Sequence, residues 1–109
     1  MTISDRAKMQ IVEHCGYETW GYVELTADTD WAAYIKTAQF LIKDERYYQA
    51  IFMCKKFGVP LSEIPEYERK KMLGLVSNGD VHATQNIAKL VKSEEDELLF
   101  NEARAGMVL

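Results

Sequence analysis

Two neighbouring stretches of the sequence place apolar residues at the spacing of an α-helix. Between residues 31 and 42, and again between residues 47 and 57, the apolar positions recur at i, i+3, i+4 and i+7 and so line one helical face. Only four polar residues, Lys43 and the triplet Asp44-Glu45-Arg46, separate the two stretches. Because helices joined by so short a connection pack antiparallel, the pattern predicts a helical hairpin over residues 31–57.

Residues with strong capping preferences mark where helices begin and end. Thr29 or Asp30 can cap the first helix of this hairpin, because a side-chain oxygen there accepts an unpaired backbone N–H. Gly58 suits the left-handed conformation that ends a helix. Asp80 and Ser93 precede later apolar patterns and are further N-cap candidates. The later helices are predicted at about residues 65–76, 81–91 and 94–106, the last with an apolar seam at Leu98, Leu99 and Ala103.

The first quarter of the chain contains one clear helix and one ambiguous segment. Residues 4–15 carry a helical apolar face and are followed by Gly16, which predicts a helix that stops there. Residues 17–25 instead alternate as a strand does. No other segment alternates, so a strand here would lack a partner. We therefore expect an irregular or helical linker over residues 17–25.

The composition fits one compact helical domain. The chain has 109 residues, of which 48% are hydrophobic and 28% are charged, values typical of a folded globular protein. No Pro-, Gly- or Ser-rich tract divides it. We expect a single all-α domain over residues 1–109, built from five to six helices arranged as antiparallel hairpins.

The two predicted hairpins resemble each other when the sequence is shifted so that the turn at 44–46 aligns with the turn at 78–80. This shift equals the period of tetratricopeptide repeats, and segment 38–50 resembles the centre of that repeat, with small residues on both sides of a turn and an aromatic. Met72 and Thr84 depart from the pattern in the second hairpin. The resemblance implies a weakly tetratricopeptide-like stack of hairpins.

The charge balance argues against a general nucleic-acid-binding protein. Lys and Arg number 13 and Asp and Glu number 17, a net charge of −4, whereas binding to phosphates requires a basic surface. Two local basic clusters, Lys55-Lys56 and Arg69-Lys70-Lys71, could form one positive face if the hairpins pack together. A nucleic-acid-associated accessory protein is therefore the alternative function, with Arg69, Lys70 and Lys71 as candidate anion-binding residues.

Few residues suit catalysis or metal binding. Cys15, Cys54, His14 and His82 lack the spacing of metal ligands, and Cys54 lies on an apolar helical face. We expect both cysteines to pack as small hydrophobic residues. No enzymatic activity, cofactor or metal site is expected.

The cysteine count and the hydropathy pattern also bear on the compartment. Two cysteines are too few for a disulfide framework. No uninterrupted apolar run approaches the roughly 20 residues that span a bilayer. We expect a cytoplasmic protein that does not act on membranes.

Aromatic residues crowd the first half of the chain and supply the candidate binding surface. Tyr48 and Phe52 stand four residues apart, beside the apolar stripe of their helix, so they share one neighbouring face. Lys55 and Lys56 lie a turn further on and could supply a polar rim. Because tyrosine and tryptophan favour interfaces, we expect a non-catalytic adaptor, regulator or inhibitor that binds another protein, or a second copy of itself, through these four residues.

A core interpretation of the same aromatic pair stays open at this point. Under that alternative, Trp20 or Tyr22 from the N-terminal segment covers Tyr48 and Phe52, and the two rings contribute to stability and not to binding.

Overall fold

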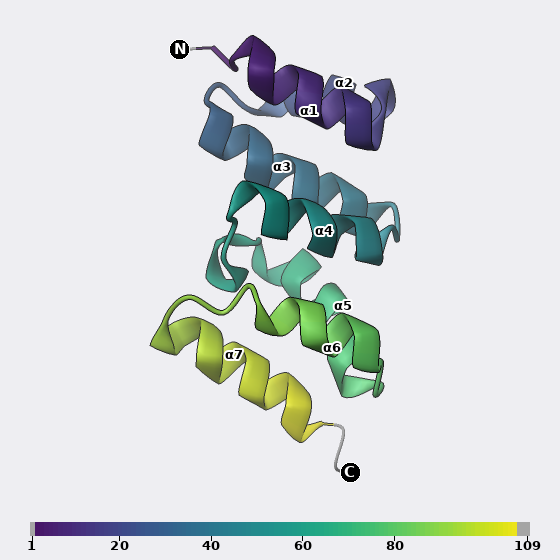
Figure 1. Cartoon of the computed structure of the whole chain (residues 1–109), viewed down its shortest axis with the longest axis vertical. Coiled ribbons are helices and arrows are strands. Elements are labelled where there is room, and N and C mark those ends of the chain that lie inside the picture. Colours follow the sequence, from purple (N-terminus) through teal and green to yellow (C-terminus); the bar gives the residue numbers. More distant parts are fainter. Residues whose placement is uncertain (1, 107–109) are drawn as a thin grey trace.

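The computed structural model describes residues 2–106, which fold as helices without any strand in that range (Figure 1). The expected all-α class is confirmed, but the expected number of five to six helices is too low for the described residues. The extra helix lies at residues 17–26, where Thr19, Trp20 and Val23 fall on one helical face and are buried. The α-helices are α1 (Asp5–Cys15), α2 (Tyr17–Thr26), α3 (Asp30–Lys43), α4 (Tyr47–Phe57), α5 (Glu66–Ser77), α6 (Val81–Ala88) and α7 (Glu94–Ala105), and a 3-10 turn, η1 (Leu61–Glu63), precedes α5.

Side-chain caps fix the start of four helices. The side-chain oxygens of Ser4, Thr29, Asp80 and Ser93 each accept the backbone N–H of the residue three positions later, at 2.9 to 3.2 Å. Gly58 ends α4 with a φ of 72°, the left-handed conformation that a glycine adopts without a Cβ clash. The predicted caps at Thr29, Asp80 and Ser93 and the stop at Gly58 are therefore confirmed.

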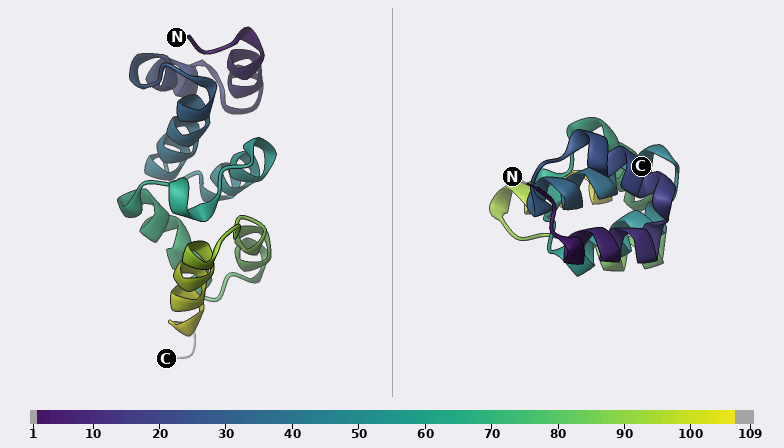
Figure 2. Two further views of the ribbon diagram at one scale, coloured as in Figure 1. Left: turned by 90° about the vertical axis from the view of Figure 1, so that its left-hand side faces the viewer. Right: turned by 90° about the horizontal axis from the view of Figure 1, so that it is seen from above.

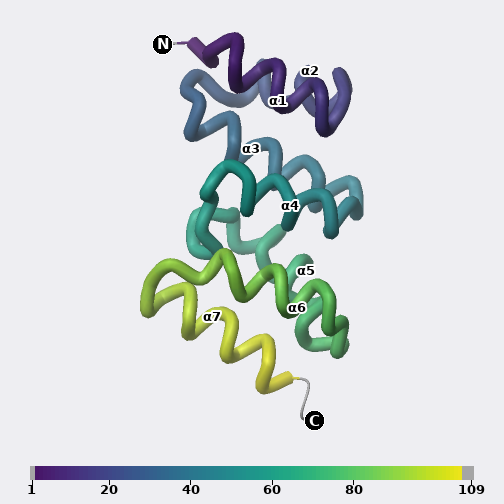
Figure 3. The backbone as a smooth tube through the Cα atoms, viewed as in Figure 1, coloured from purple at the N-terminus to yellow at the C-terminus, as the bar shows by residue number. Residues whose placement is uncertain are grey.

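The helices form an elongated stack in two layers, 44 × 25 × 20 Å in extent. Helices α1, α4 and α6 lie in the front layer of Figure 1, with α2, α3 and α5 behind them, and Figure 2 shows the two layers from the side. The backbone reverses direction between α3 and α4 and again between α5 and α6, so that α4 and α6 run side by side in the same direction (Figure 3). Helix α7 closes the C-terminal end of the stack.

Buried residues form two hydrophobic clusters. The larger cluster joins Cys15 of α1 to helices α3 to α7, and Ala38 of α3 and Ala50 of α4 are fully buried in it. The smaller cluster lies between α1, α2 and the start of α3, and it consists of Ile11, Trp20, Val23 and Ala33. Phe57 packs against both clusters and connects them.

The similarity between the two hairpins extends to the hydrogen bonds of their turns. Arg46 N–H donates to the Leu41 carbonyl at 2.8 Å, and at the corresponding positions of the later turn Asp80 N–H donates to the Leu75 carbonyl at 3.0 Å. The residue ahead of each of these donors has a left-handed φ, 59° and 83°. The turns after α3 and after α5 therefore have the same backbone structure.

Helix α7 buries most of the expected seam, since Ala103 is buried and Leu99 packs against the larger cluster, but not all of it. Leu98 is 66% exposed, so its assignment to the apolar seam is wrong, and Phe100 is buried instead. The buried carboxylate of Asp96 sets this orientation, because it accepts the backbone N–H groups of Ser62 at 2.8 Å and Lys92 at 2.7 Å. A carboxylate that satisfies two backbone donors at once anchors α7 to η1 and to the loop before it.

Candidate functional site

The outer face of α4 presents the two aromatic side chains selected from the sequence. Tyr48 is 54% exposed and Phe52 is 50% exposed, and their four-residue spacing places them on one face of the helix. Trp20 is buried in the smaller core, and the ring of Tyr22 packs against Phe40 with centroids 5.1 Å apart. Neither residue covers the aromatic pair of α4.

Rings from three helices form a row across the front layer. The His14 ring of α1 lies 5.9 Å from the Phe52 ring, and the His82 ring of α6 lies 6.0 Å from the Tyr48 ring, both pairs tilted. We call these four side chains the aromatic row. The two histidines were considered in the sequence only as catalytic or metal-binding residues. Their contacts with the exposed pair arise from helix packing.

Polar contacts hold the aromatic row in place. The Tyr48 hydroxyl donates to the Asp80 carboxylate, and the Gln49 amide donates to the His14 carbonyl. The hydrogen bond to Asp80 raises the pKa of the Tyr48 phenol. The backbone N–H of Ala83, and then the Tyr48 hydroxyl, lower the pKa of the Asp80 carboxyl. Asp80 thus caps α6 and restrains Tyr48 with the same carboxylate.

A shallow pocket of about 100 Å³ lies between α4 and α6 beside this row. At its far end, Lys55 donates to the Asn86 side-chain carbonyl at 2.8 Å. The volume is about that of three water molecules, which is enough for one apolar side chain. The pocket is lined by Tyr48, Ile51, Phe52 and Lys55 from α4 and by His82, Ala83 and Asn86 from α6.

A second depression, of about 230 Å³, adjoins the pocket at the C-terminal ends of α4 and α6. It shares Lys55 with the pocket and is also lined by Lys89 and Lys92. We call it the lysine hollow. Lys56 is exposed on the same turn of α4 but does not line it. Sequence reasoning missed Lys89 and Lys92, although the shift that aligns the two turns places Lys89 opposite Lys55.

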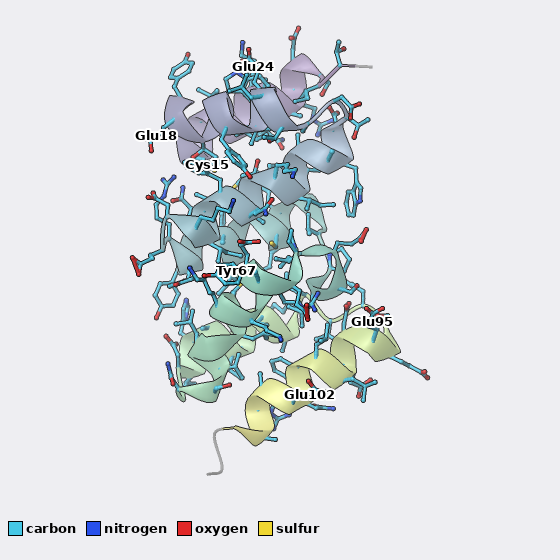
Figure 4. All side chains as sticks on the ribbon, turned by 180° about the vertical axis from the view of Figure 1, so that it is seen from behind. Cys15, Glu18, Glu24, Tyr67, Glu95 and Glu102 are labelled. Carbon is cyan, nitrogen blue, oxygen red and sulfur yellow. The ribbon has the colours of Figure 1, made fainter. Side chains whose placement is uncertain are left out.

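The second basic cluster lies on α5, in the other layer of the stack. Arg69 donates to the Ile64 carbonyl at 3.1 Å, Lys70 pairs with Glu66 at 3.6 Å, and the ammonium of Lys71 lies 4.9 Å from the Tyr67 ring centroid. Figure 4 shows Tyr67 from behind the stack. Arg69 and Lys70 line a separate depression between α5 and α7, so the structure does not join this cluster to the lysines of α4.

Both cysteines are buried, and burial raises the pKa of each thiol. The pKa of Cys15 rises to about 11, although the positive charge of Arg46 opposes the shift, and the pKa of Cys54 rises to about 12. A nucleophilic cysteine needs a lowered pKa, so neither thiol is activated. In residues 2–106 no three His, Cys, Asp or Glu side chains cluster in a way that could hold a metal ion.

Comparison with protein-family models, with curated proteins and with solved structures found no match for this chain. None of the helices in residues 2–106 combines the length and the apolar content that crossing a bilayer requires. The functional interpretation therefore depends on the geometry of the front layer.

Proposed function

We propose that this chain is a non-catalytic protein-interaction module that binds a segment of another protein along the aromatic row. The observation that carries the proposal is the half-exposed pair Tyr48 and Phe52, held in position by contacts from α1 and α6. An exposed aromatic pair gains little for the isolated fold, whereas aromatic side chains contribute much of the binding energy at interfaces.

Preorganisation supports the same conclusion. The hydrogen bond from Tyr48 to Asp80 and the ring contacts with His14 and His82 restrict the rotamers of the aromatic pair before any partner arrives. Binding a partner therefore costs less side-chain entropy in this chain. The pocket beside the row would receive an apolar side chain of the partner, with the rings packing against its flanks.

We also infer that the pairs α3–α4 and α5–α6 are repeat units in a weakly tetratricopeptide-like arrangement. The equal structures of the turns within the two pairs support this inference. Repeat stacking would place corresponding positions of successive hairpins next to one another. Tyr48 and His82, which the shift between the two turns aligns and which are in ring contact, fit that expectation.

The thiols support a non-catalytic role in a reducing compartment such as the cytoplasm. Cys15 and Cys54 are free as well as buried. A thiol with a pKa of about 11 or 12 is protonated at neutral pH and is a poor nucleophile.

Selection from a random-peptide phage library on the immobilised full chain tests the proposal. We expect selected peptides to bind the wild type and to lose binding to the double variant Tyr48→Ala, Phe52→Ala. The matched control is Tyr67→Ala, Leu98→Ala, which removes two exposed apolar side chains from α5 and α7. Circular dichroism and thermal unfolding of each variant establish that it is folded.

Two outcomes would contradict the proposal. One is that no peptide is enriched on the wild-type chain. The other is that the enriched peptides bind the folded double variant as well as they bind the wild type, or lose binding to the control variant instead.

A further inference from the structure

We propose that the partner segment is acidic: one apolar residue occupies the pocket between α4 and α6, and carboxylates about three residues away occupy the lysine hollow. This inference rests on the proposed function, because it uses the aromatic row as the anchor point. The observation behind it is that Lys55 lines both depressions, so the pocket and the lysine hollow lie next to each other.

The lysine hollow has the charge of an acid-binding site. Its lining includes Lys55, Lys89 and Lys92 and no carboxylate. Within residues 2–106, none of these three ammonium groups lies within salt-bridge distance of an Asp or Glu side chain. By contrast, Lys70 on α5 is paired with Glu66. Three ammonium groups around one depression, without a carboxylate of the same chain, complement a partner that supplies the negative charge.

The helix ends neutralise only part of this charge. Helices α4 and α6 both end beside the lysine hollow, and each C-terminus carries about half a negative charge. Three lysines and two helix ends leave roughly two positive charges, and the Asp96 carboxylate, which accepts the Lys92 backbone N–H at 2.7 Å, lowers this to roughly one. Carboxylates of a partner segment would supply the balance.

The geometry also sets the spacing of the partner motif. From Phe52 to Gly58 the α4 axis advances about 9 Å, at about 1.5 Å per residue. An extended peptide covers that length in about three residues, at about 3.3 Å per residue. An apolar side chain in the pocket thus brings carboxylates three positions away over the lysine hollow.

The negative charge of Asp80 determines at which end of the site the acidic residues of a partner can lie. It also favours a peptide over a nucleic acid. The Asp80 carboxylate lies at the Tyr48 end of the aromatic row, and its pKa is lowered, so it is ionised at neutral pH. A peptide can keep its acidic residues at the opposite end, beside the lysines. The evenly spaced phosphates of a nucleic acid would place negative charge against Asp80 as well.

Synthetic peptides test the spacing and the charge. Each peptide has a Gly/Ser background, one phenylalanine and two adjacent glutamates placed two, three, four or five positions after it. A matched set carries glutamine in place of glutamate. Binding to the ¹⁵N-labelled full chain is followed by NMR titration, which measures weak dissociation constants. We expect the three-residue spacing to bind best, and its glutamine counterpart to bind roughly tenfold more weakly.

Charge variants of the chain locate the interaction. The triple variant Lys55→Gln, Lys89→Gln, Lys92→Gln should weaken the acidic peptide roughly tenfold and leave the glutamine peptide unchanged. The control Lys43→Gln, Lys70→Gln, Lys71→Gln removes the same charge elsewhere and should change neither Kd.

The outcomes separate this inference from the proposed function. Equal binding of acidic and glutamine peptides, lost in Tyr48→Ala, Phe52→Ala, would overturn the acidic motif and retain the interaction surface. If the acidic peptide loses binding to the lysine triple variant but keeps full binding to Tyr48→Ala, Phe52→Ala, both the acidic motif and the proposed function are overturned.

Two further measurements test the choice of partner. Tighter binding of a twelve-nucleotide oligo-dT than of the acidic peptide, lost in the lysine variant, would assign the site to nucleic acid instead. Sedimentation velocity of the wild type tests whether the acidic α7 of a second copy is the occupant. A dimer abolished by Leu98→Ala and by the lysine variant would overturn the assignment to a separate partner.

Discussion

Tyr48 is the second residue of α4 and His82 is the second residue of α6, and their ring centroids lie 6.0 Å apart across the two helices. The contact exists because the two helices begin after turns of the same structure and run in the same direction. Asp80, the N-cap of α6, accepts the Tyr48 hydroxyl and joins the two residues through a third. The candidate surface therefore depends on the register between hairpins.

The phenol of Tyr48 is expected to ionise at higher pH than an ordinary tyrosine, because its hydrogen bond to Asp80 favours the protonated form. Folding is then favoured by this group below the unfolded pKa of about 10, and the contribution is lost as the pH rises through the folded pKa. The tyrosinate absorbance of wild type minus that of Tyr48→Phe isolates this titration. In Asp80→Asn the Tyr48 pKa should fall. An unchanged titration curve there would show that Asp80 does not perturb the phenol.

The double variant Tyr48→Ala, Phe52→Ala should remain folded with a small loss of stability. Both side chains are half exposed, so their truncation removes about half of the apolar contact of each ring, and the loss should be about 1 kcal/mol per ring, well below the roughly 3–5 kcal/mol of a fully buried aromatic residue. Urea unfolding measures the change. Loss of several kcal/mol would instead identify the two rings as core residues.

Replacing Ala50 with leucine should destabilise the chain by about 1–3 kcal/mol, because the added atoms overpack a fully buried position where α3 and α4 face each other. Ala88→Leu, at an exposed position of α6, is the matched control and should change stability by less than about 0.5 kcal/mol. Thermal and urea unfolding compare the two. If Ala50→Leu melts at the wild-type temperature, the inferred close packing of α3 on α4 is wrong.

Asp96→Ala should cost about 3 kcal/mol, since it leaves the backbone N–H groups of Ser62 and Lys92 without their acceptor. The exposed neighbour Glu95, labelled in Figure 4, provides the control Glu95→Ala, which keeps both acceptor bonds. Urea unfolding gives the two free energies. Hydrogen exchange at the Ser62 and Lys92 amides should accelerate only in the first variant. Equal stability of the two variants would show that the carboxylate is not an anchor.

Cys15 and Cys54 should resist iodoacetamide in the folded chain at pH 8, because burial raises their thiol pKa to about 11 and about 12. In urea both should react quickly, and mass spectrometry counts the added groups. Rapid single labelling of the native chain would show that one thiol is accessible and more acidic than its surroundings imply.

Local signals accounted for much of the helical structure. Thr29, Asp80 and Ser93 act as caps through their own side chains, and Gly58 ends α4 through its own backbone. Because these signals depend only on residues close in the sequence, the sequence predicts them. Residues 17–26 were harder, because Trp20 and Val23 become buried only against α1 and α3. The alternating pattern of residues 17–25 did not show which helices would bury these two side chains.

Only part of the candidate site could be predicted from the sequence, for a related reason. The position of Tyr48 and Phe52 beside the apolar stripe follows from helical periodicity alone. The ring contact of His14 and the position of Lys92 depend on how α1 and the loop after α6 pack on α4. Asp96 is one of four consecutive acidic residues at the start of α7, and only the tertiary fold brings the Ser62 amide to it.

The separate small core under α1 and α2 has a consequence for how tightly any ligand can bind. The smaller cluster has only four buried residues, and Phe57 together with Cys15 of α1 links this end to the larger cluster. A segment with so little buried area opens at a lower free energy than the main core. When α1 detaches, Phe52 loses the His14 ring while α4 and α6 stay in place. The observed affinity is then the intrinsic affinity multiplied by the fraction of molecules with α1 docked, so mutations in this small core would tune binding without touching the surface.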